Sequence, residues 1–150
     1  MKIKILLSLS LFIMISYSLS EEESSSREVL TAEESFKVSI KKNKNSFVIS
    51  MNINERSYIY SEHLSLRSGK KNIKHDIIGK KEIISDDFFG ESVIYKNNID
   101  LIISDYHKYI DMVIYFSYQG CLENTICYPK ITKKIKATKD KNSFISFDFL

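Results

Sequence analysis

The chain has 150 residues, 43% apolar and 27% charged, a balance typical of one folded domain and not of a disordered or membrane-embedded chain. Its 22 lysines and arginines and 19 aspartates and glutamates give a net charge of +3, too even a balance to indicate nucleic acid as the partner. Two cysteines exclude a disulfide-dense mini-protein and a four-cysteine zinc site.

The first twenty residues have the order of a secretory signal peptide. Two lysines within Met1–Lys4 precede an uncharged apolar run at Ile5–Ile15, and the small residues Ser18 and Ser20 precede the expected cut. The run is shorter than the roughly 20 residues that span a bilayer, so we predict cleavage after Ser20 and no membrane insertion afterwards. Export places both cysteines where a disulfide can form.

The remaining sequence is predicted to be a flexible, acidic leader at 21–34 followed by one β-rich domain at 35–150. Apolar and polar residues alternate there, β-branched and aromatic residues dominate, and turns follow at short intervals. The expected strands are 36–40, 47–53, 58–60, 63–66, 99–103, 110–118 and 144–149. Because no helical stripe is present, we predict an all-β fold, an antiparallel β-sandwich.

The two cysteines form the most informative local pattern. Cys121 ends an alternating strand and Cys127 opens the next apolar run, so the five residues between them suit a hairpin loop. Facing positions of a hairpin have Cβ atoms about 4.5–5.5 Å apart, close to disulfide distance. Such a short loop stabilises a fold by only about 2 kcal/mol, a weak reason to keep the cysteines there. A small hairpin-locking disulfide is the structural alternative. His63, His75 and His107 lack a zinc-site spacing with the pair, so no metal is expected.

The residues around the cysteines resemble a known family. Tyr118-Gln119-Gly120-Cys121, five residues, and then Cys127-Tyr128-Pro129 are similar to the signature of the N-terminal periplasmic domain of the DsbD thiol:disulfide interchange protein. Asp86-Asp87-Phe88-Phe89-Gly90 resembles the cap loop of that family, and Tyr58-Ile59-Tyr60 its tyrosine-rich strand. Ala32–Phe36 is similar to the segment that opens the domain. The resemblance covers roughly residues 30–140.

The resemblance implies an immunoglobulin-like antiparallel β-sandwich and a thiol:disulfide oxidoreductase activity. In the family, this domain receives electrons from a thioredoxin-like domain. It passes them to periplasmic thioredoxin-fold proteins, including disulfide isomerases and the reductant of cytochrome c maturation. By position, Cys127 corresponds to the cysteine that forms mixed disulfides with partners and Cys121 to its resolving partner. Phe88 corresponds to the cap aromatic that covers the disulfide. No cofactor beyond the redox-active Cys121–Cys127 pair is expected.

An aromatic cap would shield the sulfurs from unselected thiols, since exchange depends on access and on the thiolate fraction. Asp86 and Asp87 would disfavour a thiolate or accept a thiol proton, and Tyr58 and Tyr60 would hydrogen-bond them. The structural alternatives are a solvated acidic turn for the aspartates, strand packing for the tyrosines and a core anchor for Phe88.

Two positions depart from the family pattern. Ile126 stands where the family often has an aromatic residue, and Lys130 replaces a frequent second proline, which adds a positive charge near Cys127. The predicted surround of the active site is completed by Phe89, Gly90, Ile126 and Tyr128. The membrane part and the C-terminal thioredoxin-like domain of the family protein do not follow Leu150, so we expect a separate membrane-linked protein to donate the electrons.

Together these features predict an exported module in the periplasm of a Gram-negative envelope. It would pass electrons by dithiol–disulfide exchange between thioredoxin-fold partners. One alternative is a secreted β-sandwich that binds a partner and keeps a purely structural disulfide. A second is an envelope protein that docks an acidic partner through the basic runs 41–44, 70–74 and 133–141, which otherwise serve as solvated turns and edge protection.

Overall fold

The computed structural model describes residues 29–141 and 145–150. The predicted signal peptide, most of the leader and the start of the last predicted strand lie outside these ranges. The strands are β1 (Phe36–Lys42), β2 (Ser46–Ile53), β3 (Ser57–Tyr60), β4 (Ser65–Ser68), β5 (Lys71–Asn72), β6 (Asp76–Ile78), β7 (Lys81–Asp86), β8 (Gly90–Tyr95), β9 (Asn98–Ser104), β10 (Val113–Tyr118), β11 (Gly120–Leu122), β12 (Ile126–Cys127), β13 (Ile131–Lys139) and β14 (Ile145–Phe149). Three short helices are α1 (Ala32–Ser35), η1 (Ser61–His63) and η2 (Tyr106–Tyr109). No helix in the described ranges has the length and apolarity needed to span a membrane.

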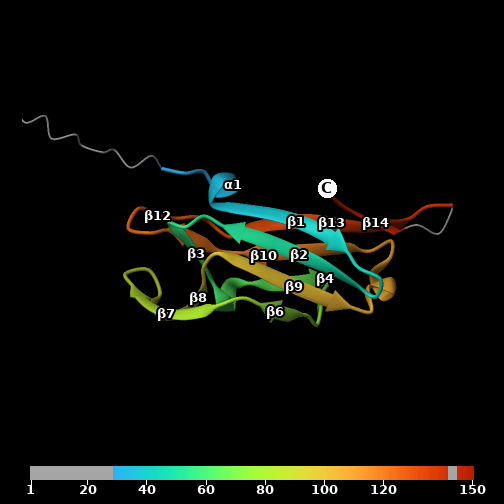
Figure 1. Cartoon of the computed structure of the whole chain (residues 1–150), viewed down its shortest axis with the longest axis horizontal. Coiled ribbons are helices and arrows are strands. Elements are labelled where there is room, and N and C mark those ends of the chain that lie inside the picture. The colour runs from blue at the N-terminus through green and yellow to red at the C-terminus, as the bar shows by residue number, and fades with distance from the viewer. Residues whose placement is uncertain (1–28, 142–144) are drawn as a thin grey trace, which may run out of the picture.

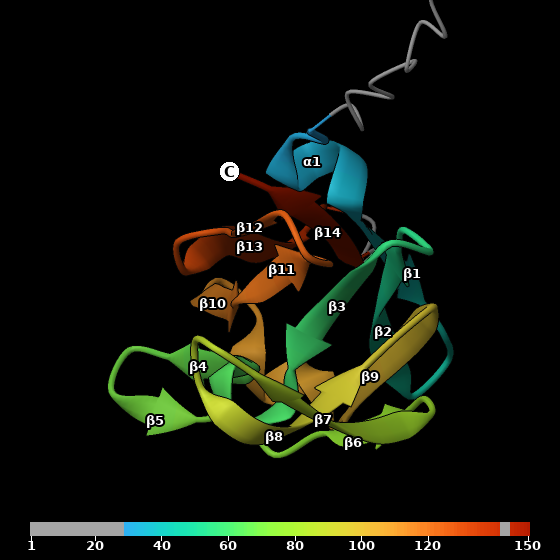
Figure 2. The same ribbon diagram turned by 90° about the vertical axis from the view of Figure 1, so that its left-hand side faces the viewer.

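The strands form three antiparallel sheets with the orders β1-β2-β9-β6, β14-β13-β10-β4-β5 and β12-β11-β3-β8-β7. Figure 1 shows the three sheets with the long axis of the molecule horizontal. Figure 2, turned by 90°, shows the first sheet on the right and β10 and β4 of the second sheet on the left. The third sheet lies toward one end, where the β7–β8 and β11–β12 hairpins are found. The predicted all-β, antiparallel sandwich is confirmed.

The core lies between the sheets and is built from alternate residues of each strand. In β2, β9 and β10 the buried side chains stand at every second position: Phe47, Ile49, Met51, Ile53, Ile99, Leu101, Ile103, Ile114, Phe116 and Tyr118. The intervening residues are exposed or half-buried, as one-sided burial of an antiparallel sheet requires. Burial of this apolar area is the main force that holds the sheets together.

One continuous stretch of chain passes from the second sheet into the third. Tyr118 of β10 pairs with Ile131, and Gly120 of β11 pairs with Ile59, so only Gln119 separates the two sheets. The Gln119 carbonyl accepts the Tyr60 N–H at 3.0 Å. The chain around Cys121 is therefore fixed directly to the core.

The N-terminal boundary of the fold precedes the predicted one at residue 35. Thr31 caps α1 in a capping box with Glu34, and Leu30 packs against the core. The end of the predicted flexible leader is therefore a capped helical turn.

Several stretches of the fold differ from the predicted strands: β5, β6 and β13 were not predicted, and the strand predicted at 63–66 begins only at Ser65, after η1. The strand predicted at 110–118 begins at Val113, because Asp105 and Asp111 adopt left-handed backbone conformations around η2. The edge strand β7 was not predicted.

Candidate redox site

Cys121 and Cys127 lie opposite each other in the β11–β12 hairpin and form a disulfide. Their Cα atoms are register partners 3.9 Å apart. The turn is closed by a hydrogen bond from the Thr125 N–H to the Leu122 carbonyl at 3.1 Å, and Asn124 takes the left-handed conformation within it. The prediction of a hairpin that brings the cysteines face to face is confirmed.

The two sulfur-bearing residues differ in access. Cys121 is only 2% exposed, on the central side of the hairpin next to β3, whereas Cys127 lies on the edge strand and is half-buried. A thiolate that approaches from solvent therefore meets Cys127 before Cys121.

Gly120 allows β11 to approach β3 closely. A Cβ at this position would overlap the carbonyl oxygen of Tyr58 and would approach Phe36 Cζ to 2.8 Å. Any larger residue would push β11 away from β3. The glycine of the cysteine signature thus positions Cys121 against the tyrosines.

Tyr58 and Tyr60 direct their hydroxyl groups to the same carboxylate. Tyr58 donates to Asp86 Oδ2 at 2.9 Å, and Tyr60 donates to the same oxygen at 2.6 Å. The Tyr60 oxygen also lies 3.2 Å from Cys121 Sγ and 3.9 Å from Cys127 Sγ. Because a phenol has one proton and an ionised carboxylate is the stronger acceptor, Tyr60 presents a lone pair to the sulfurs.

The other oxygen of Asp86 organises the cap loop. Asp86 Oδ1 accepts the N–H groups of Phe88 at 2.9 Å and Phe89 at 2.8 Å, and Gly90 closes the turn with a φ of 69°. Asp86 therefore joins the cap to the tyrosines beside the disulfide. Asp87 is exposed and lies next to it in the loop.

The charge state of this network follows from its hydrogen bonds. Burial by itself would raise the pKa of Asp86, but the donors Tyr60, Phe89, Tyr58 and Phe88 outweigh it and hold the pKa below its ordinary value. Burial, together with the carboxylate of Asp86, raises the pKa of Tyr60 above its ordinary value. Burial likewise raises the pKa of Tyr58. At neutral pH the network is one carboxylate held by two neutral phenols.

The two cap aromatics occupy different places. The Phe89 ring packs edge-on against Tyr60, with centroids 4.7 Å apart, and against His63 at 4.9 Å. Phe88 is 64% exposed and lines a hollow of about 580 Å³ together with Asp86, Asp87 and Cys121. The cap is thus anchored by Phe89, and Phe88 is exposed at the hollow that Cys121 also lines.

Two predicted surround residues lie on the hairpin but away from the sulfur atoms. Ile126 pairs with Leu122 and is 43% exposed at the hairpin tip. The Tyr128 ring is buried in the core, and its hydroxyl donates to the Leu30 carbonyl at 2.6 Å and contacts Ser35 Oγ at 2.9 Å. Tyr128 therefore fastens the base of the hairpin to the N-terminal segment and does not face the disulfide.

His63 belongs to the site, although the sequence analysis considered it only as a zinc ligand and gave it no role there. Its ring contacts both Tyr60 and Phe89, and its buried Nε2 makes no hydrogen bond with the described residues, although Glu62 lies 3.5 Å away. The sequence holds no spacing signal for this contact.

Among the described residues no group of three or more histidine, cysteine or acidic side chains is placed to hold a metal ion.

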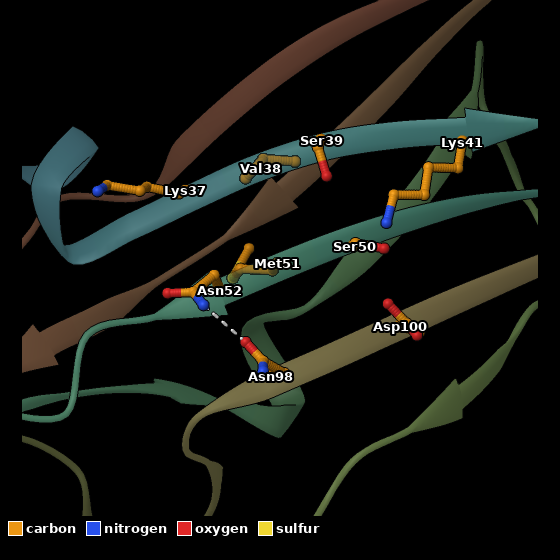
Figure 3. A pocket seen from close by; sticks show the side chains of 9 residues that line it. All are labelled: Lys37, Val38, Ser39, Lys41, Ser50, Met51, Asn52, Asn98 and Asp100. Atoms are coloured by element: carbon orange, nitrogen blue, oxygen red, sulfur yellow. Dashed lines mark hydrogen bonds between the residues drawn. The ribbon is translucent and has the colours of Figure 1, made fainter.

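A second hollow, of about 410 Å³, lies on the outer face of β1, β2 and β9 (Figure 3). Its lining mixes the cations Lys37 and Lys41 with Asp100, and Asn52 donates to Asn98 across it at 2.9 Å. No cysteine lines it, so it is a polar sheet face separate from the disulfide.

The sequence of this chain matches one family over most of its length. The family described as "Thiol:disulfide interchange protein DsbD, N-terminal" matches residues 26–139. The chain belongs to this family. Among curated proteins, the thiol:disulfide interchange protein DsbD of Colwellia psychrerythraea is 37% identical over 54 residues. The match covers 36% of this chain and 9% of that protein, so the chain spans only about a tenth of the length of this DsbD relative.

Two solved structures show the same fold. The N-terminal domain of Neisseria meningitidis DsbD in the reduced form matches with a TM-score of 0.61 at 17% identity, over 82% of this chain and 96% of that one. The complex between the DsbD N-terminal and PilB N-terminal domains of the same organism matches with a TM-score of 0.56 at 18% identity, over 71% of this chain and 85% of that one. The family membership and fold expected from the cysteine and cap motifs are confirmed.

Proposed function

We propose that this DsbD N-terminal family member is a thiol:disulfide oxidoreductase module of the periplasm that carries two electrons on its Cys121–Cys127 pair. The observation that supports this most is the placement of the disulfide: a half-buried cysteine on an edge strand, a buried cysteine beside it, and a cap that Asp86 joins to Tyr60, whose hydroxyl lies next to both sulfurs. A disulfide used only as a clip would need neither the open edge nor the cap.

The exchange takes place in two displacements. A thiolate of a reduced partner attacks Cys127 Sγ, the Cys121–Cys127 bond breaks, and Cys121 leaves as a thiolate that takes up a proton. The second cysteine of the partner, as a thiolate, then attacks the sulfur of the first partner cysteine in the mixed disulfide. Cys127 is released as a thiolate and takes up a proton. The partner has lost two electrons and two protons, and the cysteine pair has gained them. The same steps in reverse deliver them to an acceptor.

The surrounding residues control the leaving and attacking sulfurs. Once reduced, Cys121 can donate its S–H to the Tyr60 oxygen, whose own proton goes to Asp86. This arrangement favours the thiol over the thiolate and keeps the reduced pair slow toward unselected oxidants. Lys130, three residues after Cys127, adds a positive charge that favours the Cys127 thiolate. Phe88, which lines the hollow beside Cys121, would shield the pair from small thiols until a docking partner displaces it.

The partners we propose are thioredoxin-fold proteins: a membrane-linked donor, and periplasmic acceptors such as a disulfide isomerase or the reductant of cytochrome c maturation. The complex of a structurally similar DsbD domain with a PilB N-terminal domain supports docking of a separate protein on this fold. The signal-like sequence at 1–20 supports export to the Gram-negative envelope.

The test is a redox titration of the folded protein in dithiothreitol and glutathione buffers, read by thiol alkylation and mass. We expect a reversible two-electron transition well above about −300 mV, the level typical of structural disulfides. In Cys121→Ser, reaction with an oxidised thioredoxin-fold protein should trap a mixed disulfide at Cys127. A bond that stays oxidised until the fold is lost would instead establish a partner-binding sandwich with a structural clip.

A further inference from the structure

A second surface of the domain carries several cations that form no ion pair with the described residues. On the outer side of the sheet β14-β13-β10-β4-β5, Arg67 and Lys134 are the two register partners of Tyr115, which is 37% exposed. Lys136 follows on the same side of β13, and Lys130 precedes that strand. We call Arg67, Lys130, Lys134 and Lys136 the basic face.

No ion pair involves the basic face within residues 29–141 and 145–150. Among the described outward side chains of these five strands the only carboxylate is Asp148, the register partner of Lys136. A hollow of about 270 Å³ opens in this face, and Arg67 and Lys130 line it. Ser117 and Thr132, whose hydroxyls are 2.8 Å apart, line it as well. It offers cations, hydroxyl groups and an aromatic edge, and it has no acid.

The basic face is continuous with the disulfide. Ser117, in the hollow, and Cys121 are four residues apart along the chain that runs from β10 through Gln119 into β11, so their Cα atoms lie within roughly 13 Å. Lys130 follows Cys127 by three residues, so the chain holds the two Cα atoms within about 11 Å. Figure 2 shows β10 and β4 below the β11–β12 hairpin on one side of the molecule.

The cap loop and the start of β8 carry the other sign of charge. The cap contributes Asp86, Asp87 and Glu91, of which the last two are exposed. A protein that docks on Cys127 therefore meets carboxylates in the hollow beside the cap and cations in the separate hollow of the basic face. Such a gradient of potential steers association and fixes orientation.

We propose that the basic face is a docking surface for an acidic patch on the thioredoxin-fold protein that exchanges thiols with Cys127. This rests on the proposed function and adds the charge of the partner and the flank on which it docks. Continuity with the disulfide favours a protein partner over an anionic membrane surface, because the contact would then serve exchange at Cys127.

The experiment measures the second-order rate constant for disulfide reduction by a reduced thioredoxin of net negative charge. The variant is Arg67→Glu/Lys134→Glu, whose changes flank Tyr115, six residues or about 20 Å along the strand from Cys121. The matched control is Lys37→Glu/Lys41→Glu, which makes the same change in charge on the exposed outer face of β1 (Figure 3). Reduction by dithiothreitol is measured in parallel for each protein.

At low ionic strength we expect the basic-face variant to lose roughly tenfold in the thioredoxin rate and the control less than about threefold. The difference should disappear in about 1 M salt, where the Debye length is roughly 3 Å. Dithiothreitol rates should be equal in all three proteins. Equal losses in both variants, or a difference that survives high salt, would overturn the proposal.

The failure of the proposed function has a different signature. If neither dithiothreitol nor thioredoxin reduces the folded native protein, the exchange function itself fails. Sedimentation with phosphatidylglycerol vesicles tests the alternative that the basic face binds an anionic membrane surface. Vesicle binding that is lost in the basic-face variant while its thioredoxin rate is unchanged would assign the surface to anionic lipid and overturn the proposal.

Discussion

Replacement of Asp86 by asparagine tests how firmly the cap is joined to the site. The native carboxylate accepts two phenol protons on Oδ2 and two backbone N–H groups on Oδ1. An asparagine has one accepting oxygen, and its amide group would face two donors on the other side. The side chain keeps its shape but can serve only the tyrosines or only the cap.

The expected loss of stability follows from the bonds that have no substitute. The N–H groups of Phe88 and Phe89 lie in an exposed loop and can bond to water, so their loss costs little. The phenols of Tyr58 and Tyr60 are buried, and a hydrogen bond to a charged acceptor contributes about 1.5–3 kcal/mol. We expect Asp86→Asn to lower the free energy of unfolding by about 2–3 kcal/mol, measured by urea denaturation of the oxidised protein at pH 7.

Asp87→Asn is the matched control, because it removes the same charge from an exposed neighbour and should change stability by less than about 0.5 kcal/mol. The pKa of Asp86 is lowered by folding, so its contribution is complete above the unfolded pKa of about 3.9 and is lost as pH falls through the folded value. The gap between native and Asp86→Asn proteins should therefore narrow below about pH 4. Equal stability at pH 7, or a gap that widens in acid, would refute this account.

The same variant should react faster. An amide oxygen competes less strongly than a carboxylate for the Tyr60 proton, so Tyr60 can donate it to the departing Cys121 thiolate; where the amide oxygen stays with Tyr60, the cap loses its attachment instead. Each kcal/mol gained by the leaving sulfur speeds reduction by dithiothreitol about fivefold. An unchanged rate would mean that Asp86 acts on stability alone.

Three further changes have specific outcomes. Gly120→Ala should cost about 2–3 kcal/mol in urea unfolding, because its methyl group has no space between β11 and β3, and a neutral result would contradict the close approach. Tyr128→Phe should cost about 1–2 kcal/mol through the lost bonds to Leu30 and Ser35, with no change in the rate of reduction by dithiothreitol; a changed rate would place the hydroxyl in the chemistry. Phe88→Ala should speed alkylation of the reduced protein by a small reagent and change the free energy of unfolding by less than about 0.5 kcal/mol. Phe89→Ala should lower the free energy of unfolding, because its ring packs against Tyr60. An unaltered alkylation rate in Phe88→Ala would refute shielding of the cysteines by Phe88.

The local parts of the site could be predicted from sequence because each depends on neighbours in the chain. The spacing of Cys121 and Cys127 was enough to predict the hairpin, and alternation was enough to predict the sandwich. The same alternation places Tyr128 on the opposite side of the chain from Cys127, which accounts for its position in the core. Tyr128 was predicted to lie beside the disulfide because that prediction followed the family motif and not this alternation. The left-handed Asp111, which delays β10, has no comparable sequence signal.

The contacts across the site could not be predicted in this way. Tyr60, His63 and Phe89 meet because β3 pairs with β8, which brings the cap loop over η1. Phe89 is distant in sequence from Tyr60 and His63, and no fixed spacing relates it to them. Their arrangement depends on strand order, which a single sequence leaves open.

The way the cysteine hairpin is held has a consequence for its cycling between redox states. Besides the disulfide, the Tyr128 N–H donates to the Gly120 carbonyl at 3.0 Å, and the Glu123 N–H donates to the Arg56 carbonyl at 2.8 Å. The Glu123 carboxylate also pairs with Lys96. When the S–S bond opens, these contacts keep the loop closed, so reduction frees almost no chain entropy. The structural change between the oxidised and reduced states is then confined to the side chains of Cys121 and Cys127. The hairpin backbone has the same conformation at the start of each round of exchange.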